Sequence, residues 1–376
     1  MERVEVEEIE LPLEIRLKIL MNREVQIIRP VYIVAVTLTG ILCLGEFFYP
    51  YPSNWQECRV IMVIMAMKTI SISIDDYSLK RVSYKEFLGY LFCPASVVFG
   101  PWMSHDAYML YYVHHSKLNW KWLVKMIQIF TYAMIYMVIS NCLINALIPI
   151  EGGTFLPGKW HEAFRNAFVF RGTNYFIGYL GEFTMLAAGF NAYHYYDRQQ
   201  RWSYPVTRPL TVEAPRSMQT VAENWNIPTY RFLRECIYNP FFEIGPGYAI
   251  LMTYLQASLL FGLKVRVMMI LLNVVLLAQS QQLIQNKLAR WLNCCCQPSG
   301  CRDICDHRFG FWHPITLIIN GFNTVLNILH LAYLGHIMHS DFETKSIWDL
   351  YQAWDDLGIY SHVSSFVWSV TLLCMN

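Results

Sequence analysis

The stretch TYLQASLLFGLKVR, residues 253–266, decides the class of fold to which this chain belongs. Its first part is apolar, it stops at Gly262, and the basic residues Lys264 and Arg266 follow directly. A glycine at a helix end, with basic side chains just beyond it, is typical of a membrane helix that reaches water. The stretch therefore predicts a membrane protein, and the rest of the chain has to be equally apolar.

The composition of the whole chain agrees with this interpretation. The 376 residues are 55% hydrophobic, 15% aromatic and 15% charged, and their mean hydropathy is +0.28. A soluble domain has no use for so much apolar surface, so lipid must solvate it. Since a spanning helix needs roughly 20 apolar residues, we expect an all-α multi-pass protein with about eight or nine spans. The clear candidates are 31–48, 57–74, 122–148, 247–263, 266–284 and 315–338, and the weaker ones are 84–103, 164–190 and 361–375.

The chain divides into an acidic, amphipathic segment at 1–30 and one membrane domain at 31–376, because no internal repeat is visible. Within the domain, FCPASVVFGPW (92–102) predicts a re-entrant loop, since Pro and Gly are tolerated at membrane depth where backbone lines a cavity. The polar connection 196–236 predicts a short helix from Ser217 to Trp225 with Ser217 as its N-cap, followed by an interfacial helix at 229–238.

Polar residues inside the spans indicate a hollow interior, because a charge at mid-membrane is costly and faces a partner or a water-filled cavity. Three simpler interpretations stay open: Arg171 and Glu182 form a structural pair, Lys68 extends to the interface, and His330 is a hydrogen-bonded packing residue. Periodicity does not distinguish an enzyme cavity from a transport path. The polar residues concerned are Lys68, Arg171, Asn174, Glu182 and His330.

Basic segments at 16–29, 198–216, 287–290 and 302–308 are expected in the cytosol. The cysteine cluster CCCQPSGCRDIC adjoins the third of them, in a reducing compartment. Three alternatives stay open for its thiols: a metal site that also uses His307, S-palmitoylation, or an unmodified loop. The cysteines are Cys294, Cys295, Cys296, Cys301 and Cys305.

A set of short blocks identifies a resemblance. These blocks are IMVIMAMKTISISIDD (61–76), EFLGYLFCPASVVFGPW (86–102), TNYFIGYLGEFTMLAAGF (173–190), RPLTVEAPRSM with WNIP (208–228), NKLAR (286–290) and HLAYLG (330–335). In this order, over residues 60–340, the chain resembles the membrane-bound O-acyltransferase (MBOAT) family, and within it the enzymes that acylate Wnt proteins.

The resemblance implies a helical fold with an internal cavity, which lies in the endoplasmic reticulum membrane. It implies transfer of a palmitoleoyl group from acyl-CoA to a serine of Wnt proteins. Acyl-CoA is then the co-substrate, with no other cofactor, no metal and no nucleic acid. The alternative is a catalytically silent relative that binds acyl-CoA or Wnt.

The resemblance also implies the site residues. Asn226, in the WN motif, corresponds to the amide that stabilises the thioester oxygen, although an Asx-turn ahead of Pro228 is a structural alternative. The family's base is a histidine in a TYxASxLLHG-type stretch, and this chain has Phe261 there. His330 is the substitute base that we expect. Arg208, Arg216 and Trp225 are expected at the acyl-CoA entrance, because basic side chains pair with phosphates. The complete set of expected substrate contacts is Trp225, Arg216, Ser217, Arg208, Tyr175 and Phe261.

Overall fold

The computed structural model describes residues 29–48, 52–74, 83–97, 100–113, 119–148, 158–190, 192–193, 200–201, 204–298, 307–338 and 347–364. These ranges are helical except for loops and one antiparallel strand pair, β1 (Ala192–Tyr193) with β2 (Gln200–Arg201). The all-α prediction is confirmed. The acidic start at 1–28 and residues 365–376 of the weakest span lie outside the described residues.

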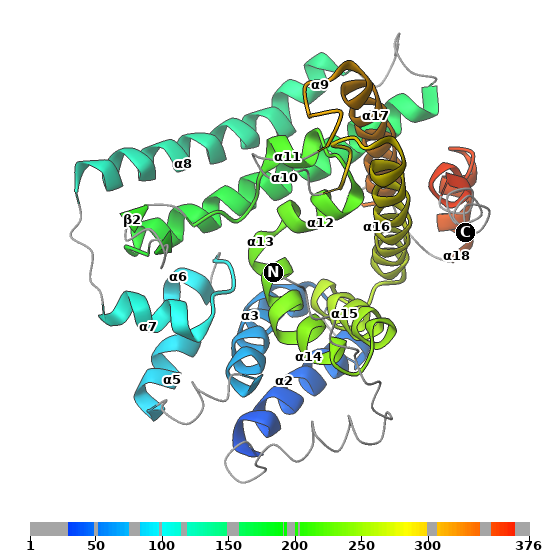
Figure 1. Ribbon diagram of the computed structural model, residues 1–376. Coiled ribbons are helices and arrows are strands. Elements are labelled where there is room, and N and C mark those ends of the chain that lie inside the picture. Colours follow the sequence, from blue (N-terminus) through cyan, green and yellow to red (C-terminus); the bar gives the residue numbers. More distant parts are fainter. Residues whose placement is uncertain are drawn as a thin grey trace, which may run out of the picture.

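One part of the molecule is built on two long helices near the N-terminus, α2 (Arg29–Phe48) and α3 (Pro52–Ile74), which pack along each other. The helix α15 (Pro246–Phe261) and the short α14 (Asn239–Phe242) lie beside this pair (Figure 1). The weak span candidate 84–103 is divided into α5 (Tyr84–Leu91) and α6 (Pro94–Val97), and α7 (His105–Val113) follows; of these, only α6 lies within the predicted re-entrant stretch 92–102. Residues 84–103 are therefore not one spanning helix.

A second part is formed by the long helix α10 (Gly158–Ala187), which packs along α8 (Trp120–Val138). Two short elements continue α8, the π-helical turn η1 (Ile139–Leu143) and α9 (Ile144–Leu147). On its other side α10 packs against α17 (Pro314–His336). Their backbones approach closely at Gly335, where a Cβ atom would lie only 2.6 Å from the Cβ of Ala167.

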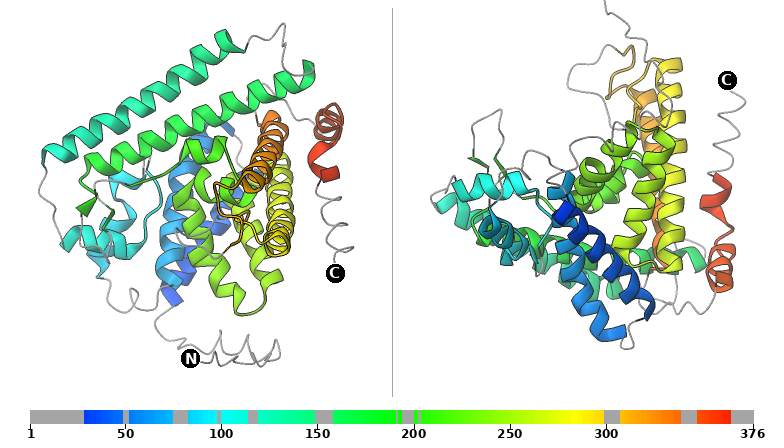
Figure 2. Two further views of the ribbon diagram at one scale, coloured as in Figure 1. Left: turned by 45° about the horizontal axis from the view of Figure 1, so that its top comes forward. Right: turned by 90° about the horizontal axis from the view of Figure 1, so that it is seen from below.

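The polar connection between the two parts lies at the centre of the molecule, and its described residues 204–238 are called the central segment. It forms α11 (Pro209–Glu213), α12 (Met218–Trp225), α13 (Ile227–Phe232) and the π-helical turn η2 (Leu233–Tyr238). The helix α16 (Val265–Leu292) runs past it together with α17, and α18 (Ile347–Asp355) lies at the periphery (Figures 1 and 2). The predicted helix from Ser217 to Trp225 is confirmed, including its N-cap: the Ser217 hydroxyl accepts a hydrogen bond from the Thr220 amide at 3.2 Å.

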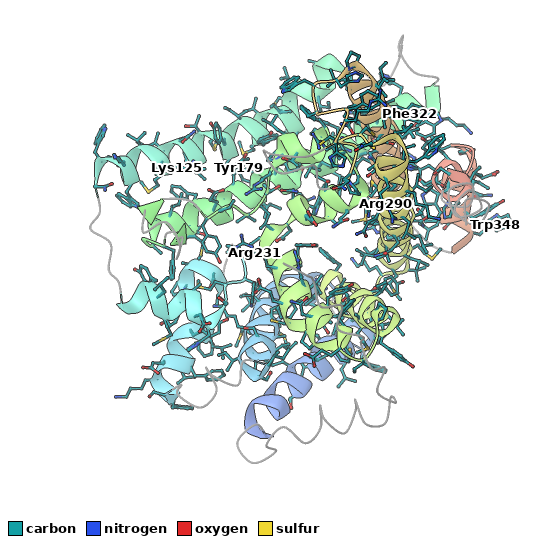
Figure 3. All side chains as sticks on the ribbon, viewed as in Figure 1. Lys125, Tyr179, Arg231, Arg290, Phe322 and Trp348 are labelled. Carbon is teal, nitrogen blue, oxygen red and sulfur yellow. The ribbon has the colours of Figure 1, made fainter. Side chains whose placement is uncertain are left out.

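Three helices among the described residues are long and apolar enough to cross a membrane: Trp120–Leu143, Val265–Leu292 and Pro314–His336. On the last of these, Phe322 points away from the protein and is 63% exposed (Figure 3). Five polar residues of the same helix are buried: Thr316, Asn320, Asn323, Asn327 and His330. This arrangement is expected of a helix with lipid on one side and a polar protein interior on the other. The expected total of eight or nine spans stays a prediction.

Candidate functional site

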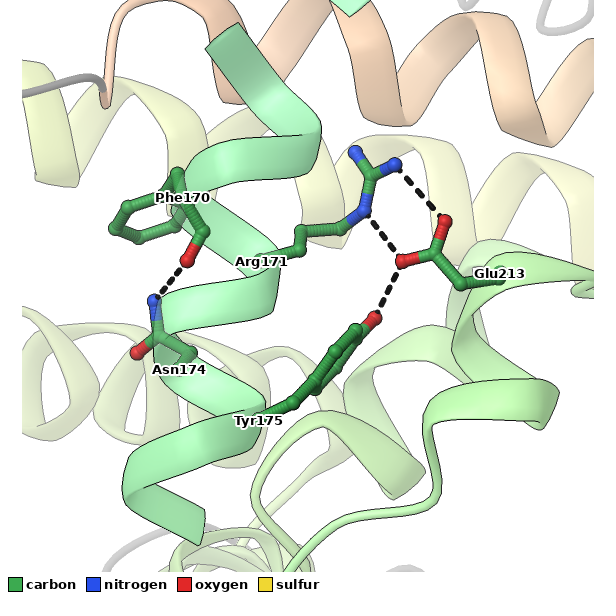
Figure 4. A network of polar contacts seen from close by, with 5 residues as sticks. All are labelled: Phe170, Arg171, Asn174, Tyr175 and Glu213. Atoms are coloured by element: carbon green, nitrogen blue, oxygen red, sulfur yellow. Dashed lines mark hydrogen bonds and ion pairs between the residues drawn. The ribbon is translucent and has the colours of Figure 1, made fainter. Parts of the chain in front are cut away.

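An ion pair and a phenol fasten α11 to α10, at the start of the central segment (Figure 4). The Arg171 guanidinium donates from Nε and Nη2 to the two carboxylate oxygens of Glu213, at 2.7 and 2.9 Å. The hydroxyl of Tyr175 donates to Oε1 of the same carboxylate at 2.7 Å. This is a bidentate pair, the strong geometry for an arginine with a carboxylate. The expected pair between Arg171 and Glu182 is therefore wrong.

Glu182 has a different role in the same helix. It is buried, and the backbone amides of Tyr204 and Val206 lie beside its carboxylate. The helix α10 thus holds the central segment at two places, with Glu182 at residues 204–206 and Arg171 at Glu213. Glu213 ends a helix of only five residues, which is too short for a periodic signal, so the sequence did not identify it as the partner.

The turn that precedes α12 is held by amide side chains of α16 and α17. Gln281 is fully buried: its Oε1 accepts from the Met218 amide at 2.8 Å, and its Nε2 donates to Asn327 Oδ1 at 2.7 Å. Asn327 in turn donates to the Pro215 carbonyl at 3.4 Å. Buried amides stabilise a fold only when both ends have partners, and Gln281 meets this condition. The start of α12 is therefore positioned by α16 and α17, two of the helices that are long and apolar enough to cross a membrane.

Gln285, one turn further along α16, donates to the backbone carbonyl of Arg216 at 3.0 Å. These amides were not among the predicted site residues, although their spacing in the sequence carries a signal. On an otherwise apolar helix, polar residues at intervals of three and four fall on one face. That signal is present at Gln281 and Gln285, and at Asn320, Asn323, Asn327 and His330.

Trp225 and Asn226 stand where α12 ends and α13 begins. The Trp225 ring stacks on Phe170 with centroids 5.8 Å apart, and it contacts Tyr175 at 6.0 Å. Asn226 is the N-cap of α13, because its Oδ1 accepts from the Thr229 amide at 3.0 Å. The local structural role expected as an alternative for Asn226 is thus observed, because its side-chain oxygen caps α13. The Nδ2 group has no hydrogen-bond partner among the described residues, so the cap fixes the oxygen and leaves the NH₂ donor unused within this part of the chain.

The other expected substrate contacts differ in their surroundings. Arg208 is exposed at the start of α11, and Arg216 is partly buried with its guanidinium 4.7 Å from the centroid of the Phe311 ring. Ser217 and Tyr175 are buried, and the hydroxyls of both are engaged, as the N-cap of α12 and the donor to Glu213. Arg208 is therefore the most accessible of these groups.

His330 lies on the buried face of α17 and is fully enclosed. Its Nδ1 is 2.9 Å from the Ser361 hydroxyl, and its ring lies 5.0 Å from that of Tyr360. Among the described residues, no hydrogen bond, ion pair or ring contact joins it to Asn226 or Phe261. The expectation that His330 and Asn226 face one cavity stays a prediction.

Phe261 is the last residue of α15 and is 41% exposed. Gly262 follows with a φ of 105°, which an L side chain rarely adopts, and closes the helix by donating to the carbonyls of Ser258 and Leu259. Arg59 of α3 also donates to the Leu259 carbonyl, at 3.2 Å, and it pairs with Glu46 of α2. The predicted stop at Gly262 is confirmed.

Lys68 does not extend to the interface, which overturns that alternative. Its side chain is fully buried, and its ammonium donates to the Tyr90 carbonyl at 2.7 Å and the Ser96 hydroxyl at 2.6 Å. It therefore satisfies a carbonyl at the C-terminal end of α5 and ties α5 to α6, where a cation is favourable. Lys68 thus holds α5 and the start of the stretch 92–102 together, and the re-entrant loop itself stays a prediction.

Three cysteines of the cluster are buried, namely Cys294, Cys295 and Cys296. Burial, and then the hydrogen bond with the Cys294 thiol, raise the pKa of Cys296 to about 12, so this thiol stays protonated and a poor nucleophile. Because all three side chains are buried, the structure does not support their S-palmitoylation. Cys301 and Cys305 lie outside the described residues. No group of three or more metal-binding side chains occurs in the part of the chain that the structure describes.

A pocket of about 410 Å³ lies on α8, lined by Trp120, Lys121, Val124, Lys125 and Gln128. None of the expected site residues lines it, so the internal cavity stays a prediction. The chemically useful group at the junction of α12 and α13 is the NH₂ donor of Asn226. Such a donor stabilises an oxygen that gains negative charge.

Comparison with known proteins identifies the chain's relatives. The model of the membrane-bound O-acyltransferase family matches residues 29–297. The protein-serine O-palmitoleoyltransferases porcupine of Mus musculus and Homo sapiens are each 30% identical over 361 residues, which cover 88% of this chain and 76% of theirs. That of Anopheles gambiae is 30% identical over 366 residues, which cover 89% of this chain and 72% of its own.

Proposed function

The chain belongs to the membrane-bound O-acyltransferase family, and on that premise we propose that it transfers a palmitoleoyl group from acyl-CoA to a serine of Wnt proteins. In this reaction the serine oxygen attacks the thioester carbon and its proton passes to a base. The C–S bond breaks, and CoA leaves as the thiol. We place the reaction in the endoplasmic reticulum membrane, with Wnt as the acyl acceptor and acyl-CoA as the only co-substrate.

The observation that carries the proposal is the orientation of Asn226. Its oxygen is occupied by the Thr229 amide, so its NH₂ group, which hydrogen bonds to no other described residue, is the part of the side chain that remains for a ligand. A preorganised donor does not have to reorient while charge develops on the thioester oxygen, which is how such groups lower a barrier. The family match at 29–297 includes this residue.

The proton acceptor in the proposal is His330, because Phe261 has no atom that accepts a proton. His330 has one ring nitrogen, Nε2, that is buried and without a hydrogen-bond partner among the described residues. An imidazole nitrogen without another partner is suited to receive the serine proton.

Substrate binding in the proposal uses the same central segment. Arg208 and Arg216 pair with the phosphates of acyl-CoA, because arginine binds phosphate through a planar fork of donors. The apolar rings of Trp225, Tyr175 and Phe261 contact the acyl chain. Ser217 contributes indirectly, because as the N-cap of α12 it stabilises the helix that carries Trp225.

The direct test is acyl transfer by the purified full chain in lipid nanodiscs. We expect acylation of a Wnt peptide by palmitoleoyl-CoA, and none of the same peptide with its acceptor serine replaced by alanine. An Arg208→Glu variant should raise the Kd for acyl-CoA, with Arg290→Glu, an exposed arginine at the end of α16, as the control. Tight acyl-CoA binding without acylation of any serine peptide would contradict transferase activity and identify a silent acyl-CoA binder.

A further inference from the structure

The contacts of His330 distinguish its two ring nitrogens. Nδ1 is 2.9 Å from the Ser361 hydroxyl, whereas Nε2 is buried and has no hydrogen-bond partner in the described part of the chain. A neutral imidazole carries one N–H donor and one acceptor nitrogen. Which nitrogen carries the proton is therefore set by what each one contacts.

The two tautomers do not fit these surroundings equally well. A proton on Nε2 would leave a buried N–H without an acceptor, and such orphaned donors are rare in folded proteins. A proton on Nδ1 is donated to the Ser361 oxygen, and only a lone pair on Nε2 is left without a partner. The surroundings of His330 thus favour Nδ1–H with Nε2 as the vacant acceptor.

Ser361 reaches His330 through an unusual turn at the end of α18. Trp354 and Leu357 are buried in the same apolar cluster as Tyr333 of α17, which docks α18 there. The chain then reverses, with the Ile359 amide donating to the Trp354 carbonyl at 2.9 Å. Gly358 and Ile359 both have positive φ, 75° and 50°. That conformation is strained for a β-branched residue, so the surrounding contacts must sustain it.

The residues after the turn supply those contacts. The Tyr360 ring covers His330, the Ser361 hydroxyl bonds to its Nδ1, and His362 Nδ1 is 2.9 Å from the Tyr333 hydroxyl. Three successive residues therefore contact two positions of α17 that lie one turn apart. The contacts of residues 360–362 with α17 sustain the strained backbone at Ile359, and this backbone in turn places Ser361 beside His330.

We propose that Ser361 is a positioning residue for His330: it holds the ring in the Nδ1–H tautomer and leaves Nε2 as the proton acceptor. This inference rests on the proposed function, in which His330 takes the serine proton. Ser361 itself touches no substrate atom in this mechanism and exchanges no proton with the acceptor.

The test measures the tautomer of His330 by NMR and the acyl-transfer rate in separate experiments. Protein labelled with ¹⁵N-histidine reports protonated and unprotonated ring nitrogens by NMR, and the His330 signals are assigned by their loss in His330→Gln. We expect Nδ1 protonated and Nε2 unprotonated in the unmodified chain. In Ser361→Ala the His330 signals should move towards a mixture of tautomers, with acyl transfer lowered about tenfold. Ser361→Thr, which keeps the hydroxyl, should restore both.

Ser364→Ala is the matched control, because that hydroxyl donates to the Ser361 backbone carbonyl and does not contact His330. It should leave spectrum and rate unchanged. A proton on Nε2 in the unmodified chain, or an unaltered His330 spectrum in Ser361→Ala, would overturn the inference. The expected tautomer in a protein that transfers no acyl group would instead refute the proposed function and leave the tautomer assignment standing.

Discussion

The substitution Asn226→Asp separates the two roles that the structure gives to this side chain. An aspartate keeps the oxygen that accepts from the Thr229 amide at 3.0 Å, and it caps a helix as well as asparagine does. It loses the NH₂ group that would stabilise the thioester oxygen. Removing one such donor costs about 10² to 10³ in rate, equivalent to about 2.7–4 kcal/mol. We therefore expect Asn226→Asp to fold normally and to transfer acyl groups at about a hundredth of the rate or less.

The matched variant Asn226→Ala removes the cap as well as the donor. Loss of an N-cap costs about 0.5–2 kcal/mol of stability, so this variant should show the same loss of rate together with a lower melting temperature. The assays are single-turnover acylation of a Wnt peptide and thermal unfolding in the same detergent. If Asn226→Asp transfers acyl groups as fast as the unmodified chain, Asn226 is only a helix cap and the donor role is refuted.

Three further substitutions test the other contacts. Glu213→Gln should lower the free energy of unfolding by about 3–5 kcal/mol, because Arg171 is left buried without a counter-charge. An unchanged melting temperature in this variant would show that the ion pair is dispensable. Lys68→Met should cost about 1–3 kcal/mol and speed proteolysis at 83–100, because the Tyr90 carbonyl loses its donor; unchanged cleavage would contradict the tie between α5 and α6. Phe261→His should leave serine acylation within about tenfold of the unmodified chain, because His330 already supplies the base. A rise of about 10² to 10⁴ would show that position 261 is the vacant base position and would contradict the role of His330.

The site was predictable where a local rule applied. Ser217 and Asn226 cap the helices that follow them because their short side chains reach backbone amides three residues ahead, which depends only on nearby residues. Gly262 ends α15 for a similar reason, since a glycine adopts positive φ without strain. The partner of Arg171 was not predictable in this way, because Glu213 lies 42 residues further along the chain.

The sequence by itself determined the all-helical class, the three long apolar helices, the stop at Gly262 and the family, because each depends on composition, on a local signal or on the order of short blocks. Tertiary structure alone decided which buried polar groups meet. Lys68 binds α5 and α6 instead of reaching the interface, and His330 bonds to Ser361. The physical reason is that a buried polar side chain must satisfy its hydrogen bonds with whatever backbone or side chain folding brings beside it. That neighbour is set by how the helices pack, and hydrophobic periodicity does not encode it.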